Sequence, residues 1–285
     1  MCMDETLFND DNKQNGNAAN AGDGPKHIAW LRFIDLLGEK LRTIVETHSG
    51  GGMYRVPNDR FCLGLPEESV LGRHQRRFGS PGSDRTTYYS ASGDQALTRM
   101  PSGCKYIAFE KCKTTANRLA AVARMRGRAE DLDSRPISYA GDGNAANSLR
   151  ALLTNLNKPL LVMADPFELC DLQRASREIQ GVDEVRSILF GVTDQHDGPG
   201  REDSERGWIS IVKQFQGLSR IAWKWTGNPG LQTADNYLFF LQIATSIDDE
   251  GGEMLQRLKR EHEILMDCRA ASHAYVSDGP MRVDD

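Results

Sequence analysis

A short apolar run that ends in an acid and breaks at once into glycine places the strongest constraint on this chain. Residues 43–46 read Thr-Ile-Val-Glu, and residues 50–52 are all glycine. β-Branched residues favour a strand, whereas glycine lets the backbone turn sharply and approach a ligand closely. A strand that runs into a glycine-rich loop is how a Rossmann-like domain begins its cofactor site. We therefore predict a first strand and, directly after it, a cofactor-binding loop that includes Gly50 and Gly52.

Three later strand-like runs also end in acids, at residues 106–110, 136–142 and 160–165. Parallel strands present their carboxyl ends at one edge of a sheet, so these acids are expected to lie together. The remaining periodic runs are strand-like at 185–192, 208–215, 219–225 and 237–243, and helical at 28–41, 114–126, 147–155 and 250–271. This alternation predicts an α/β, Rossmann-like sheet with a nucleotide-type cofactor, for which S-adenosylmethionine is the most natural candidate.

Composition excludes several classes of function. The net charge of −5 argues against a uniformly basic nucleic-acid binder, although it permits a local basic face. No apolar run approaches the roughly 20 residues that cross a bilayer, and the N-terminus carries no signal sequence, so we expect a cytoplasmic protein with no membrane contact. The six cysteines form no CxxC pair and the six histidines have no ligand spacing. We therefore expect reduced thiols and no metal.

The spacing of the acids predicts an insertion. In a plain Rossmann-like sheet the second acid follows the first by about 20 residues, whereas Glu110 lies far beyond Glu46 here. We expect a largely disordered segment at 1–24, then one domain at 25–285 with a mainly helical insertion at about 55–102. The insertion carries a basic cluster, Arg73, Arg76 and Arg77, that would suit phosphate contacts to a substrate. A solvated charged loop is the alternative for this cluster.

The strongest candidate for chemistry is Asp165-Pro166-Phe167, directly after the apolar run at 160–164. An exocyclic amine on a base is a poor nucleophile because its lone pair is delocalised into the ring. A carboxylate and a backbone carbonyl can accept its two N–H bonds and free that lone pair, while an aromatic ring stacks on the exposed base. We predict that these three residues are catalytic. The alternative is that Asp165 caps the next helix, with Pro166 in its first turn.

Two other acids have predicted roles in binding the cofactor. Glu110 can accept hydrogen bonds from both ribose hydroxyls, and Asp142, followed by Gly143, stands where an acid meets the adenine. The alternatives are a surface ion pair of Glu110 with Lys111 or Lys113, and a hairpin turn at Asp142. A histidine beside a glycine-rich loop, here His48, is either a cofactor contact or a hydrogen-bonded structural residue.

Several short segments, taken in order, resemble one known family. Residues 19–27 read Ala-Asn-Ala-Gly-Asp-Gly-Pro-Lys-His, residues 47–54 read Thr-His-Ser-Gly-Gly-Gly-Met-Tyr, and residues 78–81 read Phe-Gly-Ser-Pro. They resemble the AGNxADxxKH segment, THAGAGxY loop and PGSP element of the RlmJ-type enzymes, which methylate N6 of an adenine in bacterial 23S ribosomal RNA. The resemblance implies a class I S-adenosylmethionine-dependent methyltransferase acting on RNA rather than DNA. It implies a cofactor pocket lined by Lys26, His27, His48, Ser80, Glu110 and Asp142.

The fourth motif departs from that family. Its DPPY sequence is replaced here by Asp-Pro-Phe-Glu at residues 165–168. The chain also resembles the three-Cys-motif partner proteins, which share the Lys-His helix start, the glycine-rich loop, a GSP element and a DPF-type strand end. Two functions follow. The first is an RNA adenine-N6 methyltransferase, and the alternative is a methyltransferase-like protein that binds a protein partner and has weak or no transfer activity.

Overall fold

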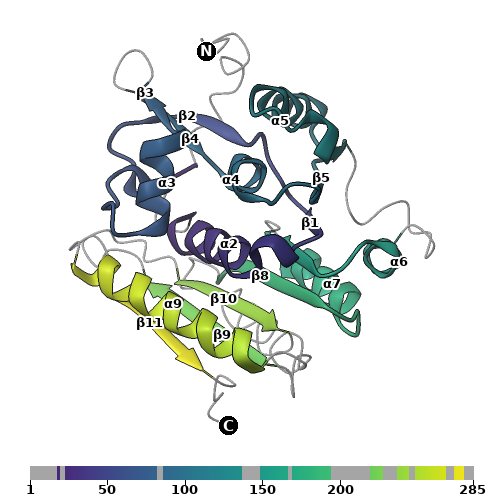
Figure 1. Ribbon diagram of the computed structural model, residues 1–285. Helices are drawn as coiled ribbons and strands as arrows, with labels where there is room; N and C mark the ends of the chain where they lie inside the picture. The colour runs from purple at the N-terminus through teal and green to yellow at the C-terminus, as the bar shows by residue number, and fades with distance from the viewer. Residues whose placement is uncertain are drawn as a thin grey trace.

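The computed structural model describes residues 18–19, 23–81, 86–136, 148–165, 169–193, 219–226, 236–243, 248–267 and 273–278. Its central feature is an eight-stranded sheet in the order β11-β9-β10-β8-β7-β1-β5-β6 (Figure 1). The strands are β1 (Thr43–Glu46), β5 (Lys105–Phe109), β6 (Leu132–Arg135), β7 (Leu160–Ala164), β8 (Val185–Thr193), β9 (Ser219–Thr226), β10 (Asn236–Ile243) and β11 (His273–Asp278).

The sheet is parallel in one half and antiparallel in the other. Strands β6, β5, β1, β7 and β8 run parallel, whereas β10 is antiparallel to both β8 and β9. The helices are α2 (Asp23–Leu37), α4 (Ser92–Arg99), α5 (Lys113–Met125), α6 (Leu149–Asn155), α7 (Leu169–Ile179) and α9 (Asp248–Asp267). Parallel strands connected through helices, with the strand order reversing at β1, form a Rossmann-like arrangement. The predicted α/β fold class is confirmed.

The two middle strands are buried on both faces, which is why they read as continuous apolar runs. Every residue of β1 and β7 is buried. Successive side chains point to opposite faces, so Ile44 packs with the cluster under α2, α4 and α5, whereas Val45 packs with α6 and α7. The largest side chain of the first cluster, Trp30, comes from α2, which also supplies Phe33. The core therefore holds β1 rigidly from both sides.

The insertion after β1 contains a small sheet as well as helices. Strands β2 (Met53–Pro57), β4 (Thr86–Ser90) and β3 (Ser80–Pro81) pair antiparallel in the order β2-β4-β3, with α3 (Val70–Phe78) packed beside them. The expected helices are present, but the sheet was not foreseen from the sequence. Its strands are short, and two of them carry proline or polar residues without a clean alternation, so their periodicity is weak.

Some predicted boundaries were wrong. The strand expected at 136–142 is β6, which ends at Arg135; Pro136 lies outside it, and residues 137–142 lie outside the described chain. Proline lacks the N–H that a ladder needs, and the register of β6 is set by Leu132 opposite Tyr106. Helix α2 begins at Asp23 rather than at Ile28. The run at 208–215 is not among the described residues, and β11 was not predicted.

A buried carboxylate joins three helices that are far apart in the sequence. Glu261 of α9 is fully buried. Its Oε1 accepts a hydrogen bond from Arg32 Nε of α2 at 3.0 Å. It also accepts one from the Val70 backbone N–H, at the start of α3, at 3.0 Å. Figure 1 shows α9 lying beside α2 on the side where α3 begins. This one side chain therefore links the last described helix to the insertion.

We expect Glu261→Ala to lower the free energy of unfolding by about 3 kcal/mol, because it leaves the Arg32 charge and the Val70 N–H without their shared acceptor. Glu253 on the same helix pairs with Arg257 but is 54% exposed, so Glu253→Ala is the matched control and should cost less than about 1 kcal/mol. Urea unfolding measures both. Equal losses in the two variants would show that Glu261 does not join the helices.

Candidate cofactor and substrate site

The chain that leaves β1 is bonded to the strands on both sides of it. The Thr47 N–H donates to the Met163 carbonyl of β7 at 2.9 Å, and the Ser49 N–H donates to the Phe109 carbonyl of β5 at 3.0 Å. Strand order reverses at β1, and ligands of open α/β sheets bind in the crevice at such a switch point. The predicted acids Glu110 and Asp165 directly follow β5 and β7, so the structure brings both to this edge.

The loop after β1 requires glycine. Gly50 and Gly52 have positive φ of +60° and +78°, a conformation that other residues rarely adopt. A Cβ on Gly50 would stand 2.1 Å from the Tyr54 hydroxyl, which accepts a hydrogen bond from the Gly51 N–H at 2.8 Å. A Cβ on Gly51 would meet the Arg118 side chain at 2.9 Å. The backbone of the loop therefore packs closely against side chains of the protein itself.

Glu110 closes this loop from the neighbouring strand. Its Oε2 accepts the Gly50 N–H at 3.1 Å, and its Oε1 accepts the Cys112 N–H at 2.8 Å. Within the described residues it forms no ion pair with Lys111 or Lys113, so that alternative is not what the structure contains. Each carboxylate oxygen has two lone pairs, so each keeps one for a further donor such as a ribose hydroxyl.

Lys26 and Asp165 form an ion pair across this edge. The Lys26 ammonium at the start of α2 lies 2.6 Å from Asp165 Oδ2 and 2.8 Å from Asp23 Oδ1. Burial alone would lower the pKa of Lys26, but the two carboxylates outweigh it and raise that pKa above its usual value. A predicted cofactor residue thus contacts a predicted catalytic residue. The contact with Asp165 is made through its Oδ2.

The two histidines of the prediction occupy different surroundings. His27 is buried, and its Nδ1 is hydrogen-bonded to the Tyr89 hydroxyl while the rings stack. Burial, helped by the Lys26 charge, lowers the pKa of His27 to about 3, so the ring stays neutral. His48 lies at the loop itself, 2.8 Å from Thr47 Oγ1, and burial lowers its pKa although Asp165 and Asp171 oppose the shift. Of the two, only His48 lies in the loop that leaves β1.

The other predicted residues lie elsewhere or outside the described chain. Ser80 pairs with Tyr88 in the small sheet of the insertion, and no hydrogen bond in the described ranges links it to the edge at β1. Asp142, Gly143, Pro166 and Phe167 fall within undescribed residues. The Asp165 carboxylate itself is directed to Lys26, and whether it also caps the following helix involves those residues.

Glu46 is a residue of this edge to which the sequence gave no role. It ends β1, is 1% exposed, and accepts hydrogen bonds from the Ser92 and Tyr106 hydroxyls. Burial raises the pKa of Glu46 to about 8, against the opposing effect of the two hydroxyls and of Lys26. Its position at the end of a strand was the feature of the sequence that could have identified it. Its burial depends on α4, which covers it, and that contact has no local sequence pattern.

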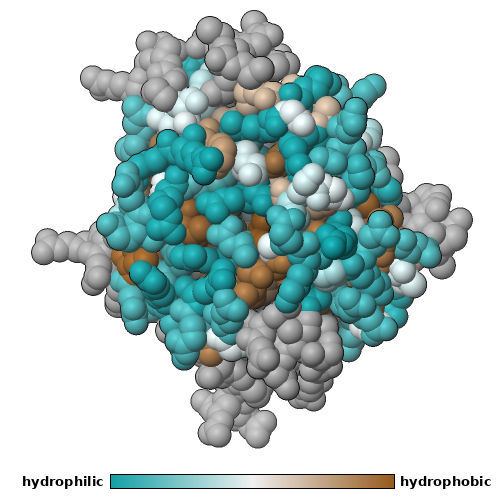
Figure 2. Space-filling model, viewed as in Figure 1, coloured by the Kyte–Doolittle hydropathy of each residue, from teal (hydrophilic) through white to brown (hydrophobic). Residues whose placement is uncertain are grey.

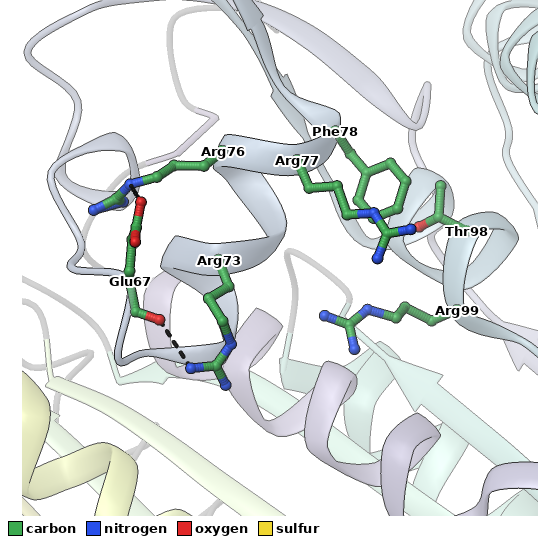
Figure 3. A pocket seen from close by; sticks show the side chains of 7 residues that line it. All are labelled: Glu67, Arg73, Arg76, Arg77, Phe78, Thr98 and Arg99. Carbon is green, nitrogen blue, oxygen red and sulfur yellow. Dashed lines mark hydrogen bonds and ion pairs between the residues drawn. The ribbon is translucent and has the colours of Figure 1, made fainter.

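The predicted substrate arginines gather at a separate hollow. Arg73, Arg76 and Arg77 of α3 line a cavity of about 590 Å³ together with Arg99 of α4. Figure 3 shows the side chains from both helices around this space, and Glu67 pairing with Arg76 at one side of it. The other lining residues are Phe78 and Thr98. None of these arginines contacts the loop that leaves β1 through any hydrogen bond in the described chain.

The described residues contain no group of three His, Cys, Asp or Glu side chains arranged to hold a metal ion. Among the same residues, no helix combines the length and the apolar character that crossing a bilayer needs. Figure 2 shows that the face seen in Figure 1 is mainly hydrophilic, with small apolar patches between polar side chains.

Neither a family model nor a curated protein matches the sequence. Among solved structures, a Legionella pneumophila str. Philadelphia 1 protein of family DUF519 aligns with a TM-score of 0.63 and 16% identity over 93% of this chain and 99% of that chain. An O-methyltransferase from Bacillus cereus, in complex with SAH, aligns with a TM-score of 0.47 and 11% identity over 79% and 84% of the two chains. The O-methyltransferase TomG from Streptomyces achromogenes, in complex with SAM, aligns with a TM-score of 0.44 and 11% identity over 77% and 80%.

The first of these likenesses shows a shared fold over nearly the whole chain. The sheet agrees with the predicted fold class, whereas its strand order comes from the structure alone. Five parallel strands are followed by antiparallel β10, which inserts between β8 and β9. The chain therefore has a Rossmann-like sheet, with an insertion after its first strand.

We expect the stability of the protein to fall as pH rises from about 4.5 to about 8, because of Glu46. Over this window the carboxyl ionises in the unfolded chain, whose pKa is 4.5, while the folded protein holds the proton up to about pH 8. Glu46→Gln is neutral in both states, so its free energy of unfolding should gain a few kcal/mol relative to the native protein across the window. Urea unfolding at several pH values measures this, with the exposed Glu130→Gln as control. Parallel pH profiles for Glu46→Gln and the native protein would contradict it.

Proposed function

We propose that this protein is an S-adenosylmethionine-dependent methyltransferase that acts on an amino nitrogen, with N6 of an adenine in RNA as the substrate. The observation that carries the proposal is the pairing of two features at one edge of the sheet. The glycine loop is closed by Glu110, and directly across β1 the Asp165 carboxylate is held by Lys26. One feature suits a nucleoside cofactor and the other suits an amine.

The cofactor half of the proposal rests on the loop after β1. Its backbone is free of Cβ atoms at three successive positions, and Glu110 keeps lone pairs beside it for the two ribose hydroxyls. His48 borders the same loop. Asp142 and Gly143, which follow β6 in the sequence, are proposed to meet the adenine. These residues fit a nucleoside with a flexible charged tail, and S-adenosylmethionine would supply a methyl group that is activated by its sulfonium.

The transfer half rests on Asp165. Its Oδ2 is fixed by the Lys26 ammonium, which orients the carboxylate at this edge. Its Oδ1 is then the acceptor for one N–H of the target amine, and the backbone carbonyl of Pro166 is proposed to accept the other. Drawing both N–H bonds out of the ring plane frees the nitrogen lone pair for attack. Phe167 is proposed to stack on the base after it leaves its helix.

The first expected result is micromolar binding of S-adenosylmethionine to the full chain, measured by calorimetric titration, and its loss in Glu110→Ala. The loss follows because the variant lacks both the ribose acceptor and the tie to the Gly50 N–H. Glu130→Ala is the matched control, since this exposed acid precedes β6 at the opposite edge of the sheet. Absence of binding to the native chain would overturn the enzyme assignment and favour a methyltransferase-like partner protein.

The second expected result concerns transfer at constant binding. Asp165→Ala should lower single-turnover methylation of an adenine-containing RNA hairpin pool by at least about 100-fold, because a preorganised acceptor for the reacting amine is lost. Its affinity for S-adenosylmethionine should stay within a few-fold of the native value. The single-turnover rate of Asp165→Asn, which keeps an oxygen acceptor, should lie between those of the native protein and Asp165→Ala. Weakened cofactor binding with unchanged turnover of the bound complex would refute the role given to Asp165.

A further inference from the structure

The hollow between α3 and α4 carries an excess of positive charge. Of its four arginines, Arg76 pairs with Glu67 at 2.9 Å and Arg99 pairs with Asp35 at 2.9 Å. Within the described part of the chain, Arg73 donates to the backbone carbonyls of Glu67 and Glu68, at 2.8 and 2.9 Å. Neither Arg73 nor Arg77 forms an ion pair with any residue that the structure describes. Two guanidinium charges are thus left for an external anion.

The lining favours phosphate over a base. A guanidinium presents a planar fork of donors that matches two phosphate oxygens, and it holds its charge at every physiological pH. The one aromatic ring, Phe78, already has the Arg77 and Arg126 guanidinium groups near it, 5.1 and 5.3 Å from its centroid. The Thr98 hydroxyl is turned back onto its own helix, to the Asp94 and Gln95 carbonyls. What remains available in the hollow is cationic.

The distance between this hollow and the proposed site of transfer can be estimated along α2 and α4, because each helix has contacts at both places. On α2, Lys26 binds Asp165 and Asp35 binds Arg99, nine residues apart, which is about 13 Å along a helix axis. On α4, Ser92 binds Glu46 at the end of β1, and Arg99 follows seven residues later, which is about 10 Å. The two estimates start from different contacts at the edge of the sheet, both end at Arg99, and give similar distances. A single base held at Asp165 is therefore too short to reach Arg99 in the hollow.

We propose that this arginine hollow binds the phosphate backbone of the RNA substrate at a point remote from the target adenine. The inference rests on the proposed function and specifies its substrate class. At about 3.4 Å of rise per stacked nucleotide, 13 Å corresponds to about four nucleotides. The substrate is then a polynucleotide that continues for at least that distance beyond the methylated base, and mononucleotides or trinucleotides bind without the help of the hollow.

The test compares the native full chain with Arg73→Ala/Arg77→Ala, using the anisotropy of fluorescently labelled RNAs of 3 and 20 nucleotides over a range of salt concentrations. Both side chains are exposed, so the double variant should stay folded. For the longer RNA we expect about tenfold weaker binding and a salt slope smaller by about 1.4, since each single-strand phosphate contact contributes about 0.7. The trinucleotide should bind equally to both proteins. Arg257→Ala on α9 is the control and should change neither quantity.

Several outcomes would overturn the inference. One is an unchanged salt slope for the longer RNA, and another is an equal loss for both RNA lengths. Full competition by inorganic pyrophosphate or by poly-glutamate at equal charge concentration would assign the hollow to a small anion or to an acidic protein instead. Failure of the proposed function gives a different result. If S-adenosylmethionine does not bind while the length-dependent loss persists, the RNA site stands and the methyltransferase assignment falls.

Discussion

The backbone leaving β1 is bonded to β7 through Thr47 and to β5 through Ser49, and the candidate site depends on this double attachment. It spreads the loop across the point where strand order reverses. Each following feature is placed by it. Gly50 meets the Glu110 carboxylate from one neighbouring strand, and the Asp165 carboxylate stands at the end of the other. Because both neighbours are parallel strands with buried faces, the edge cannot shift without disrupting the core.

Two buried carboxylates connect the insertion to the sheet domain. Asp94 is paired with both Nε and Nη2 of Arg126 at 2.8 and 2.9 Å and also accepts the Ser90 hydroxyl at 2.6 Å, while Glu261 joins α9 to α2 and α3. Removing a charge from water is costly unless its oxygens find donors, so such groups tolerate few alternative arrangements. Their effect is on orientation. They fix how α3 and α4, and hence the arginine hollow, lie relative to the edge at β1.

This division places the proposed cofactor and amine contacts apart from the proposed phosphate contacts. The edge at β1 combines a glycine backbone with carboxylates, which suits hydroxyl and amine donors, whereas the hollow offers cations to phosphates. Helices α2 and α4 connect the two places. The N-terminal part of each helix contacts the edge at β1, and its C-terminal part lies at the hollow. A net charge of −5 is compatible with RNA binding on these terms, because the positive charge is concentrated at one place rather than spread over the surface.

The sequence by itself determined the strand pattern, the first glycine loop and the acids at the strand ends. Runs at 43–46 and 160–164 are buried on both faces, so their hydrophobicity is continuous and their bounds are readable. Only the tertiary structure decided which side chains meet. Lys26 and Asp165 are 139 residues apart, Arg32 and Glu261 are 229 apart, and Arg99 joins the hollow from a helix with no basic motif. Local periodicity records which face of an element is buried, but it carries no information about what that face packs against, and the small sheet, the burial of Glu46 and the remote hollow all arise from such contacts.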